Sequence, residues 1–244
     1  MKILVCISVV PDTTSKITID QSSSLINYDG LTFIVGPYDD YALSRALEIK
    51  EINQAEVVIL HVGNAESEPL IRKCLALGAD RAIRINADSV DSNQIANEIT
   101  DYVKENAFDL ILMGKESIDY NSALVHSLVA NQLGFQHFSP VMKLDVLGED
   151  RIEILVETDE GKANVKCQLP VVLGCQEPIA EWKIPSMRGI MLARTKTIQV
   201  VELKSSAMIQ IKQCSVKENN RQQIMISADN AESLIDMLKS ESLI

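Results

Sequence analysis

The segment Gly114-Lys115-Glu116-Ser117-Ile118-Asp119 is the part of the sequence best suited to bind a ligand. It follows a short apolar run and precedes a stretch with helical periodicity. A turn of this kind can offer backbone N–H groups and the positive end of a helix to a phosphate. The segment matches neither G-x-G-x-x-G nor G-x-x-x-x-G-K-[ST], so an ordinary strand-to-helix turn is the alternative interpretation.

No other group of side chains has the spacing of a catalytic or metal site. The three histidines, His61, His126 and His137, are scattered, and no HExxH motif occurs. The five cysteines are odd in number and form no CxxC, which argues against a zinc knuckle or a thioredoxin-like motif. The nucleophile elbow G-x-S-x-G is also absent. We therefore expect no catalytic residue and no metal, which favours a binding subunit over a self-contained enzyme.

The composition is that of a globular protein with an acidic surface. Hydrophobic residues make up 46% of the 244 residues and charged residues 23%, so a packed core is expected. The formal net charge of −11 argues against binding to nucleic acid or anionic membranes, which requires basic patches. No apolar run approaches the roughly 18 residues of a transmembrane helix, and none near Lys2 suits a signal peptide. We expect a cytoplasmic protein without direct membrane insertion.

Short apolar runs alternate with helical patterns along most of the chain. The runs are typical of strands that are buried on both faces of a parallel sheet. They lie at residues 2–8, 57–60, 82–85, 110–113 and 171–173. The helical patterns cover residues 40–51, 68–77, 92–105 and 121–133. This alternation predicts right-handed βαβ units and a doubly wound, mostly parallel α/β sheet of the Rossmann type, which binds ligands at the carboxyl ends of its strands.

The pattern changes in the second half of the chain. Three alternating runs, separated by glycine-containing turns, predict antiparallel hairpins added to the sheet at residues 141–144, 152–156 and 163–167. After about residue 176 the sheet-core character is lost, although Ile224-Met225-Ile226 is typical of a strand and Asn230 opens a helical pattern. We therefore expect a nucleotide-binding-type α/β domain (1–176), a partner-docking loop and helix (177–204) and a C-terminal arm that packs on a partner subunit (205–244).

Several segments are distinctive when their order and spacing are taken together. They are KILVCISVVPD (2–12), LIRKCLALGADRAIR (70–84), DLILMGKESID (109–119), and LPVV (169–172) followed by IPSMRGIM (184–191). On these segments the chain resembles the beta (small) subunit of electron transfer flavoproteins along nearly all its length.

The resemblance implies an adenine-nucleotide alpha-hydrolase-like fold and an electron carrier rather than an enzyme. In that family the beta subunit pairs with an alpha subunit that holds most of the FAD, and it binds AMP itself. The heterodimer carries electrons from flavin dehydrogenases, such as the acyl-CoA dehydrogenases of fatty acid oxidation, to a membrane quinone oxidoreductase. We expect the same cofactors and partners for this chain.

The resemblance also implies roles for individual residues near the cofactors. Thr13 and Tyr38 match positions that approach the flavin, and Glu157 matches a carboxylate that helps orient the mobile FAD domain. A longer set matches the family's AMP site. These cofactor-binding residues are Cys6, Gly36, Pro37, Tyr38, Asp39, Val62, Asp119, Tyr120, Asn121, Ser122, Ala123, Leu124, Val125, His126, Ser127 and Ala130.

A second surface is implied for contact with dehydrogenases. Ile184, followed by Pro185 and Met187, matches the apolar anchor by which family members dock. Together with Ile190, Met191 and Leu192, these side chains can form an apolar surface patch, and methionine adapts to several partners. The alternative is that they pack beneath the C-terminal tail.

The sequence departs from the family pattern at the expected phosphate site. The family usually carries further acidic residues after Asp119 and then a Thr-Gly-Gln-like stretch, where this chain has Tyr120-Asn121-Ser122-Ala123 and Leu124-Val125-His126-Ser127. Fewer polar groups remain to bind a phosphate, although backbone N–H groups, Asn121 and Ser122 can still serve. An empty site or a different nucleotide is therefore an alternative.

Two other functions compete with this interpretation. A bifurcating-type subunit would hold a second FAD in the same pocket and oxidise NADH, which would make the complex an enzyme. A stand-alone nucleotide-binding regulator of the universal-stress type would share the sheet. The extension after residue 176 argues against the regulator, because a stand-alone domain needs no such arm.

Overall fold

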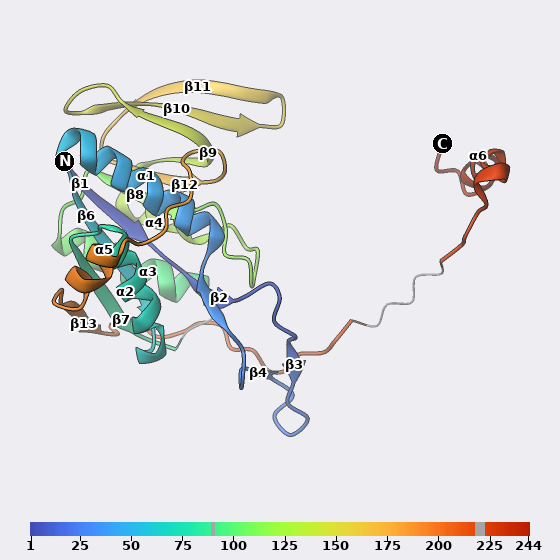
Figure 1. Cartoon of the computed structure of the whole chain (residues 1–244), viewed down its shortest axis with the longest axis horizontal. Helices are drawn as coiled ribbons and strands as arrows, with labels where there is room; N and C mark the ends of the chain where they lie inside the picture. The colour runs from blue at the N-terminus through green and yellow to red at the C-terminus, as the bar shows by residue number, and fades with distance from the viewer. Residues whose placement is uncertain (89–90, 218–222) are drawn as a thin grey trace.

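The computed structural model describes residues 1–88, 91–217 and 223–244, and within them one large sheet forms the centre of the molecule (Figure 1). The strands of this sheet are, in spatial order, β11 (Gly161–Gln168), β10 (Arg151–Thr158), β9 (Gln136–Val146), β12 (Val171–Cys175), β8 (Leu110–Gly114), β1 (Lys2–Cys6), β6 (Glu56–Gly63), β7 (Arg81–Asn86) and β13 (Ile198–Glu202). The predicted α/β fold is confirmed.

The strand directions establish the doubly wound topology. Neighbouring strands from β9 across to β13 run parallel, whereas β10 and β11 add as antiparallel strands at one edge. The predicted antiparallel hairpins are thus β9–β10 and β10–β11. The chain passes from β1 outward to β6 and β7, and it then returns to place β8 on the other side of β1. The strand order therefore reverses between β1 and β8, which is where such sheets bind ligands.

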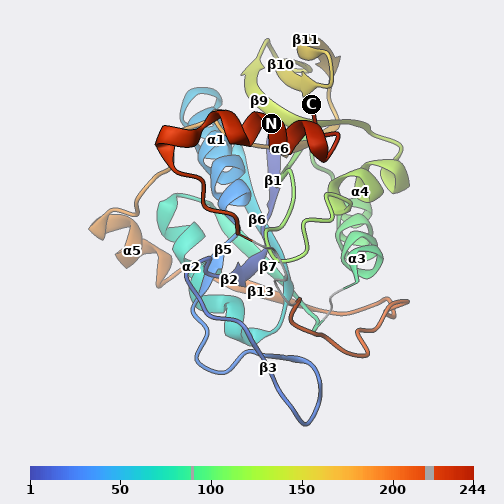
Figure 2. The ribbon, with the colours of Figure 1, turned by 90° about the vertical axis from the view of Figure 1, so that its right-hand side faces the viewer.

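Helices cover both faces of the sheet, as Figure 2 shows. On one face lie α1 (Pro37–Asn53), α2 (Glu68–Leu77) and α5 (Met187–Ala193), and on the other lie α3 (Ser92–Glu105) and α4 (Val125–Leu133). Each face has its own apolar core, because side chains along each strand alternate between the two faces. The central strands β8 and β12 are buried along their whole length, which explains their continuous apolar sequences.

The helix boundaries follow local signals in most places. Both α2 and α3 have the predicted bounds, and the Asp91 side chain caps α3 by accepting the backbone N–H of Asn93 at 2.9 Å. Helix α1 begins earlier than predicted, at Pro37, since proline suits the first turn of a helix. The predicted start of α4 at residue 121 is wrong. Asn121 and Ala123 have φ of 49° and 50°, left-handed values that no right-handed helix accommodates.

Two small sheets that were not predicted extend the loop between β1 and α1. Strand β2 (Val9–Pro11) pairs with β5 (Phe33–Val35), and β3 (Thr18–Ile19) pairs with β4 (Ile26–Asn27), both antiparallel. Figure 1 shows them projecting from the carboxyl edge of the main sheet. Their strands are only two or three residues long, which is too short for periodicity to reveal.

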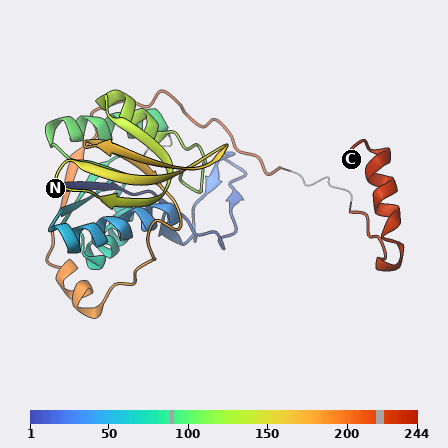
Figure 3. The same cartoon turned by 90° about the horizontal axis from the view of Figure 1, so that it is seen from above.

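The C-terminal part of the chain contains one more sheet strand and then leaves the body. Strand β13 pairs with β7 at the sheet edge and was not predicted. The predicted strand at 224–226 is wrong, because the segment is exposed and pairs with no neighbouring strand among the described residues. A short 3₁₀ turn, η2 (Ala228–Asn230), precedes α6 (Glu232–Ser240), which lies apart from the α/β body in Figures 1 and 3. None of the helices in the described ranges combines the length and apolarity needed to span a bilayer.

Candidate functional site at the carboxyl edge of the sheet

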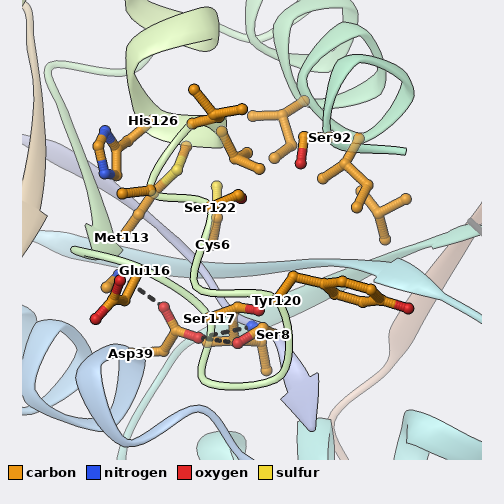
Figure 4. A pocket seen from close by; sticks show the side chains of 18 of the residues that line it. Cys6, Ser8, Asp39, Ser92, Met113, Glu116, Ser117, Tyr120, Ser122 and His126 are labelled. Carbon is orange, nitrogen blue, oxygen red and sulfur yellow. Dashed lines mark hydrogen bonds between the residues drawn. The ribbon is translucent and has the colours of Figure 1, made fainter. Parts of the chain in front are cut away.

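A cavity lies at the carboxyl ends of β1, β6 and β8, where the strand order reverses (Figure 4). Its volume is about 180 Å³, more than ten times the roughly 10–15 Å³ that one water molecule needs. The strand ends form its floor, the first turns of α3 form one wall, and the chain from Lys115 into the first turn of α4 forms the other. The cavity is therefore large enough for an organic ligand.

The cavity brings together many of the residues that the sequence predicted for a nucleotide. Its lining includes Cys6, Asp39, Val62, Asp119, Tyr120, Ser122, Ala123, Leu124, Val125 and His126. The remaining predicted residues, Gly36, Pro37, Tyr38, Asn121, Ser127 and Ala130, lie in the same segments but do not line it. The Ser127 hydroxyl donates to the Leu124 carbonyl at 2.8 Å. Ala130 lies on the side of α4 that packs in the apolar core. Thr13 and Glu157 lie outside the cavity.

Asp39, in the first turn of α1, holds the ends of β1 and β8 together. Its Oδ2 accepts the backbone N–H of Ser8 at 2.8 Å and the Ser8 hydroxyl at 2.5 Å, and its Oδ1 accepts the backbone N–H of Gly114 at 2.7 Å. Figure 4 shows these bonds at the floor of the cavity. Both carboxylate oxygens are therefore used by the protein, so Asp39 shapes the site rather than binding the ligand by its side chain.

The close packing around Asp39 affects its pKa and requires glycine at two neighbouring positions. Burial raises the pKa of Asp39 to about 6, although the hydrogen bonds from Ser8 and Gly114 oppose the rise. A Cβ atom on Gly36 would lie 2.5 Å from Asp39 Oδ2, and one on Gly114 would lie 2.7 Å from Oδ1. Glycine at both positions is what allows the strand end and the helix start to approach the carboxylate this closely.

The loop before α4 is held in a compact turn. The Ser117 hydroxyl and the Tyr120 backbone N–H both donate to Asp119 Oδ1, the latter at 2.9 Å, and the Asn121 N–H donates to the Ser117 carbonyl at 2.8 Å. Asp119 therefore stabilises the loop. Its carboxylate lies on the cavity wall, where these two hydrogen bonds stabilise its negative charge.

Helix α4 presents an uncapped start to the cavity. Leu124 precedes it, no side chain caps its first backbone N–H groups, and its first turn carries no acidic residue. Unsatisfied N–H groups and the positive end of the helix dipole suit an anion such as a phosphate. Apolar side chains complete the walls, chiefly Ile95, Ile99 and Met113. Burial raises the pKa of the Cys6 thiol, so this residue is a neutral apolar group in the wall.

Two histidines support the loop that begins at Lys115 and forms one wall of the cavity. His126 Nε2 lies 2.7 Å from the Lys115 carbonyl, and His137 Nε2 lies 2.8 Å from His126 Nδ1. The carbonyl can only accept, so His126 carries its proton on Nε2 and accepts from His137 at Nδ1. Burial lowers the pKa of both, to about 4 for His137. His126 therefore supports the loop as a neutral imidazole and has no free nitrogen for a ligand.

Acidic pH is expected to affect Asp39 and the histidines with opposite signs. Below pH 6.5 the histidines of the unfolded chain bind protons, whereas the buried histidines of the folded chain stay neutral. Their contribution to the free energy of unfolding is therefore lost as pH falls from 6.5 towards the lowered pKa values. Native Asp39 holds a proton that the unfolded chain releases above 3.8, so its contribution falls as pH rises from 4 to 6.

Variants should separate these two effects. His137→Gln keeps an N–H donor towards His126 but cannot titrate, and it is expected to reduce the gain in the free energy of unfolding between pH 4.5 and 6.5. Asp39→Asn is expected to enlarge that gain, because the opposing contribution is gone. Urea unfolding curves across this pH range provide the measurement. A profile that neither variant changes would contradict the assignment.

Several lining residues were missed by sequence reasoning. Ser8, Ser92, Ile95 and Ile99 line the cavity, and only Ser8 has a sequence signal, because it ends a predicted strand run. The segment 114–119 was singled out as a possible phosphate turn, and all of it except Ile118 lines the cavity. His137 could not have been found, since its contact with His126 joins β9 to α4.

Among the described residues, no three His, Cys, Asp or Glu side chains are grouped as metal ligands.

Comparison with known proteins agrees with this architecture. The chain matches the family model described as "Electron transfer flavoprotein domain" over residues 26–206. It is 35% identical over 197 residues to "Electron transfer flavoprotein subunit beta" of Bacillus subtilis (strain 168), covering 79% of this chain and 75% of that protein. For the protein of the same description from Dictyostelium discoideum, the identity is 25% over 249 residues, with 100% and 99% covered. The chain therefore belongs to the electron transfer flavoprotein family, in the group of its beta subunits.

Proposed function

We propose that this chain is the beta subunit of a heterodimeric electron transfer flavoprotein that binds AMP and helps an alpha subunit hold FAD. The observation that carries the proposal is the cavity at the strand-order reversal, with apolar walls and an uncapped helix start, in a chain of this family. The heterodimer would carry electrons from flavin dehydrogenases, such as acyl-CoA dehydrogenases, to a quinone oxidoreductase. The chain itself would be a carrier subunit with no substrate of its own.

The residues of the cavity fit a mononucleotide such as AMP. An adenine ring suits the apolar wall that Ile95 and Ile99 form on α3, facing Val125 on α4. A phosphate suits the uncapped first turn of α4, with Ser122 on the same lining. The nucleotide would have a structural role there, because it joins α3, α4 and the loop between them.

The FAD would supply the redox chemistry, and this chain would contribute side chains that orient it. Tyr38 lies at the start of α1, with the Lys115 ammonium 4.8 Å from its ring centroid. Glu157, at the end of β10, accepts a hydrogen bond of 2.5 Å from Gln176 Nε2. Gln176 is buried, so it holds the exposed Glu157 carboxylate in one position. Thr13 is exposed on the turn after β2. These groups lie outside the AMP cavity, as a separate flavin contact requires.

The apolar segment before and within α5 would dock on dehydrogenases. Ile184 and Met187 are each 76% exposed, and Met191 is 67% exposed. Side chains of this size and exposure gather where a partner covers them. Packing beneath the C-terminal tail, the alternative considered above, does not cover these side chains in the structure.

Ile184→Ala is expected to weaken reduction of the heterodimer by its dehydrogenase. Loss of a central apolar contact costs about 1 kcal/mol or more at such a surface, which corresponds to about a fivefold rise in the KM for the heterodimer. The FAD content should not change, since Ile184 does not line the cavity and is not among the residues proposed to contact the flavin. Leu147→Ala, at an exposed apolar position on the β9–β10 turn, is the matched control. Equal KM values for the two variants would refute the docking assignment.

The pairing itself is tested by expressing the chain with the alpha subunit of the same organism. Co-purification of the two chains in equal amounts, with a flavin absorbance spectrum, is the expected result. A chain that purifies only as a homodimer without flavin would contradict the proposed function, and it would support the stand-alone regulator.

A further inference from the structure

Trp182, the only tryptophan of the chain, is fixed to the body beside the docking segment. It lies between β12 and α5, two residues before Ile184, and its side chain is half exposed. The indole Nε1–H donates to Asp40 Oδ2 at 3.2 Å. The Lys73 ammonium lies 5.8 Å from the centroid of the ring, within the range of a cation–π interaction. The ring is thus held from α1 by a carboxylate and from α2 by a cation.

Asp40 is an unusual anchor because it is a buried carboxylate with few partners. The residue is 9% exposed, and its Oδ1 is buried without a hydrogen-bond partner among the described residues. Its place in the first turn of α1 favours the negative charge, and Lys73 lies close enough to lower the pKa that burial raises. A buried carboxylate is destabilising unless its environment compensates it. Here the Trp182 indole N–H and the Lys73 ammonium compensate the Asp40 carboxylate, which in turn holds the indole ring in position.

The segment around Trp182 is attached to the body at further points. Lys183 forms an ion pair with Glu51 of α1 at 3.5 Å. Helix α5 packs so closely on α2 that a Cβ atom on Gly189 would lie 2.2 Å from the Ala76 carbonyl oxygen. Ile184 therefore lies between two fixed points, Trp182 on one side and α5, which begins at Met187, on the other. Figures 1 and 3 show this segment leaving β12 and ending in α5.

We propose that Asp40 is a positioning residue for docking. Its carboxylate, together with Lys73, holds Trp182 against the body and thereby keeps Ile184 and Met187 exposed in the conformation that contacts a flavin dehydrogenase. The inference rests on the proposed docking function of this segment. Without Asp40, the chain between β12 and α5 would lose its attachment to the start of α1 and would sample other conformations before docking.

Trp182 is the only tryptophan of this chain, so its emission in the purified heterodimer is the difference between the wild-type complex and the complex that carries Trp182→Phe. Asp40→Ala is expected to shift the Trp182 emission to longer wavelength and to increase its quenching by acrylamide at least about twofold. Asp40→Asn keeps an oxygen that can accept the indole N–H, so it should restore most of the protection. Lys73→Gln removes the cation alone and gives a second reading should the alanine variant fold poorly. Unchanged emission and quenching in Asp40→Ala and Lys73→Gln would overturn the proposal.

Kinetics with a purified flavin dehydrogenase of the same organism test the consequence for docking. Asp40→Ala and Trp182→Phe are expected to raise the KM for the heterodimer about threefold or more, with an unchanged kcat and FAD content. If Ile184→Ala raises the KM but these variants do not, the positioning role is wrong and the docking function stands. If none of the variants, Ile184→Ala included, changes the KM, the docking function itself fails and the positioning role fails with it.

Discussion

Replacing Asp39 by alanine is expected to lower the free energy of unfolding by about 3 kcal/mol and to release the nucleotide that is proposed to fill the cavity. The change leaves the backbone N–H groups of Ser8 and Gly114 without the acceptor that they share. Each unsatisfied buried donor costs roughly 1–3 kcal/mol, and removal of a buried charge with a raised pKa returns part of this. Because these bonds join the ends of β1 and β8, the floor of the cavity loses its geometry together with its stability.

The measurement combines urea unfolding of the variant with the amount of AMP that co-purifies with it. Asp39→Asn should lie between wild type and Asp39→Ala, since an amide retains one acceptor for the two backbone donors. Asp150→Ala, on the exposed turn between β9 and β10, is the matched control and should change stability by less than about 0.5 kcal/mol. An alanine variant at position 39 that matches this control in stability and nucleotide content would contradict the role assigned to the carboxylate.

Deletion of residues 205–244 is expected to abolish most of the heterodimer yield while leaving the α/β domain folded. The two cores draw on residues up to Val201, so the domain loses no buried apolar side chain. The arm begins firmly attached. Glu98 of α3 accepts the backbone N–H of Ser205 at 2.6 Å, and Asp91 accepts that of Met208 at 2.7 Å. The deletion therefore removes these attachments together with the part of the arm that is proposed to contact the alpha subunit.

The apolar side chains of the arm explain the size of the expected effect. Many are exposed, among them Met208, Ile224, Met225, Leu234, Ile235 and Leu243. Each aliphatic side chain that a partner buries fully contributes about 1.5–3 kcal/mol. Loss of two such contacts weakens the heterodimer by about 3 kcal/mol, or more than a hundredfold in Kd.

A variant of α6 tests the arm without shortening the chain. Leu234→Glu combined with Ile235→Glu places charges on the apolar side of the helix, and it should lower the yield of co-purified alpha subunit. Lys239→Glu, at a polar position of the same helix, is the matched control. If the deletion and the double variant both leave the heterodimer intact, the arm is dispensable for pairing.

The sequence predicted those elements whose patterns are long and buried. Helices α2 and α3 have the expected bounds because a proline, a glycine and the Asp91 cap define their ends. Strand β13 was not predicted because its five residues neither alternate strictly nor form a continuous apolar run, and they lie partly exposed at the sheet edge. The start of α4 was misplaced because hydrophobic periodicity does not reveal the positive φ that Asn121 and Ala123 adopt.

The candidate site was predictable only in part, and for a physical reason. Cys6, at the end of a strand, and Leu124, just before a helix, could be assigned to the site from their position in the predicted elements and from the family resemblance. The role of Asp39 as a bridge between β1 and β8 depends on Ser8 and Gly114 approaching from distant parts of the chain. The attachment of Trp182 to Asp40 likewise joins residues that only the fold brings together.

The content of small molecules in the purified heterodimer tests the central claim most directly. The complex would be denatured, and the released nucleotides would be separated and counted against protein by absorbance and mass spectrometry. The account predicts one AMP and one FAD per heterodimer, with AMP lost in Asp39→Ala. Two FAD without AMP, as in a bifurcating complex, or FAD with no AMP at all, would contradict it.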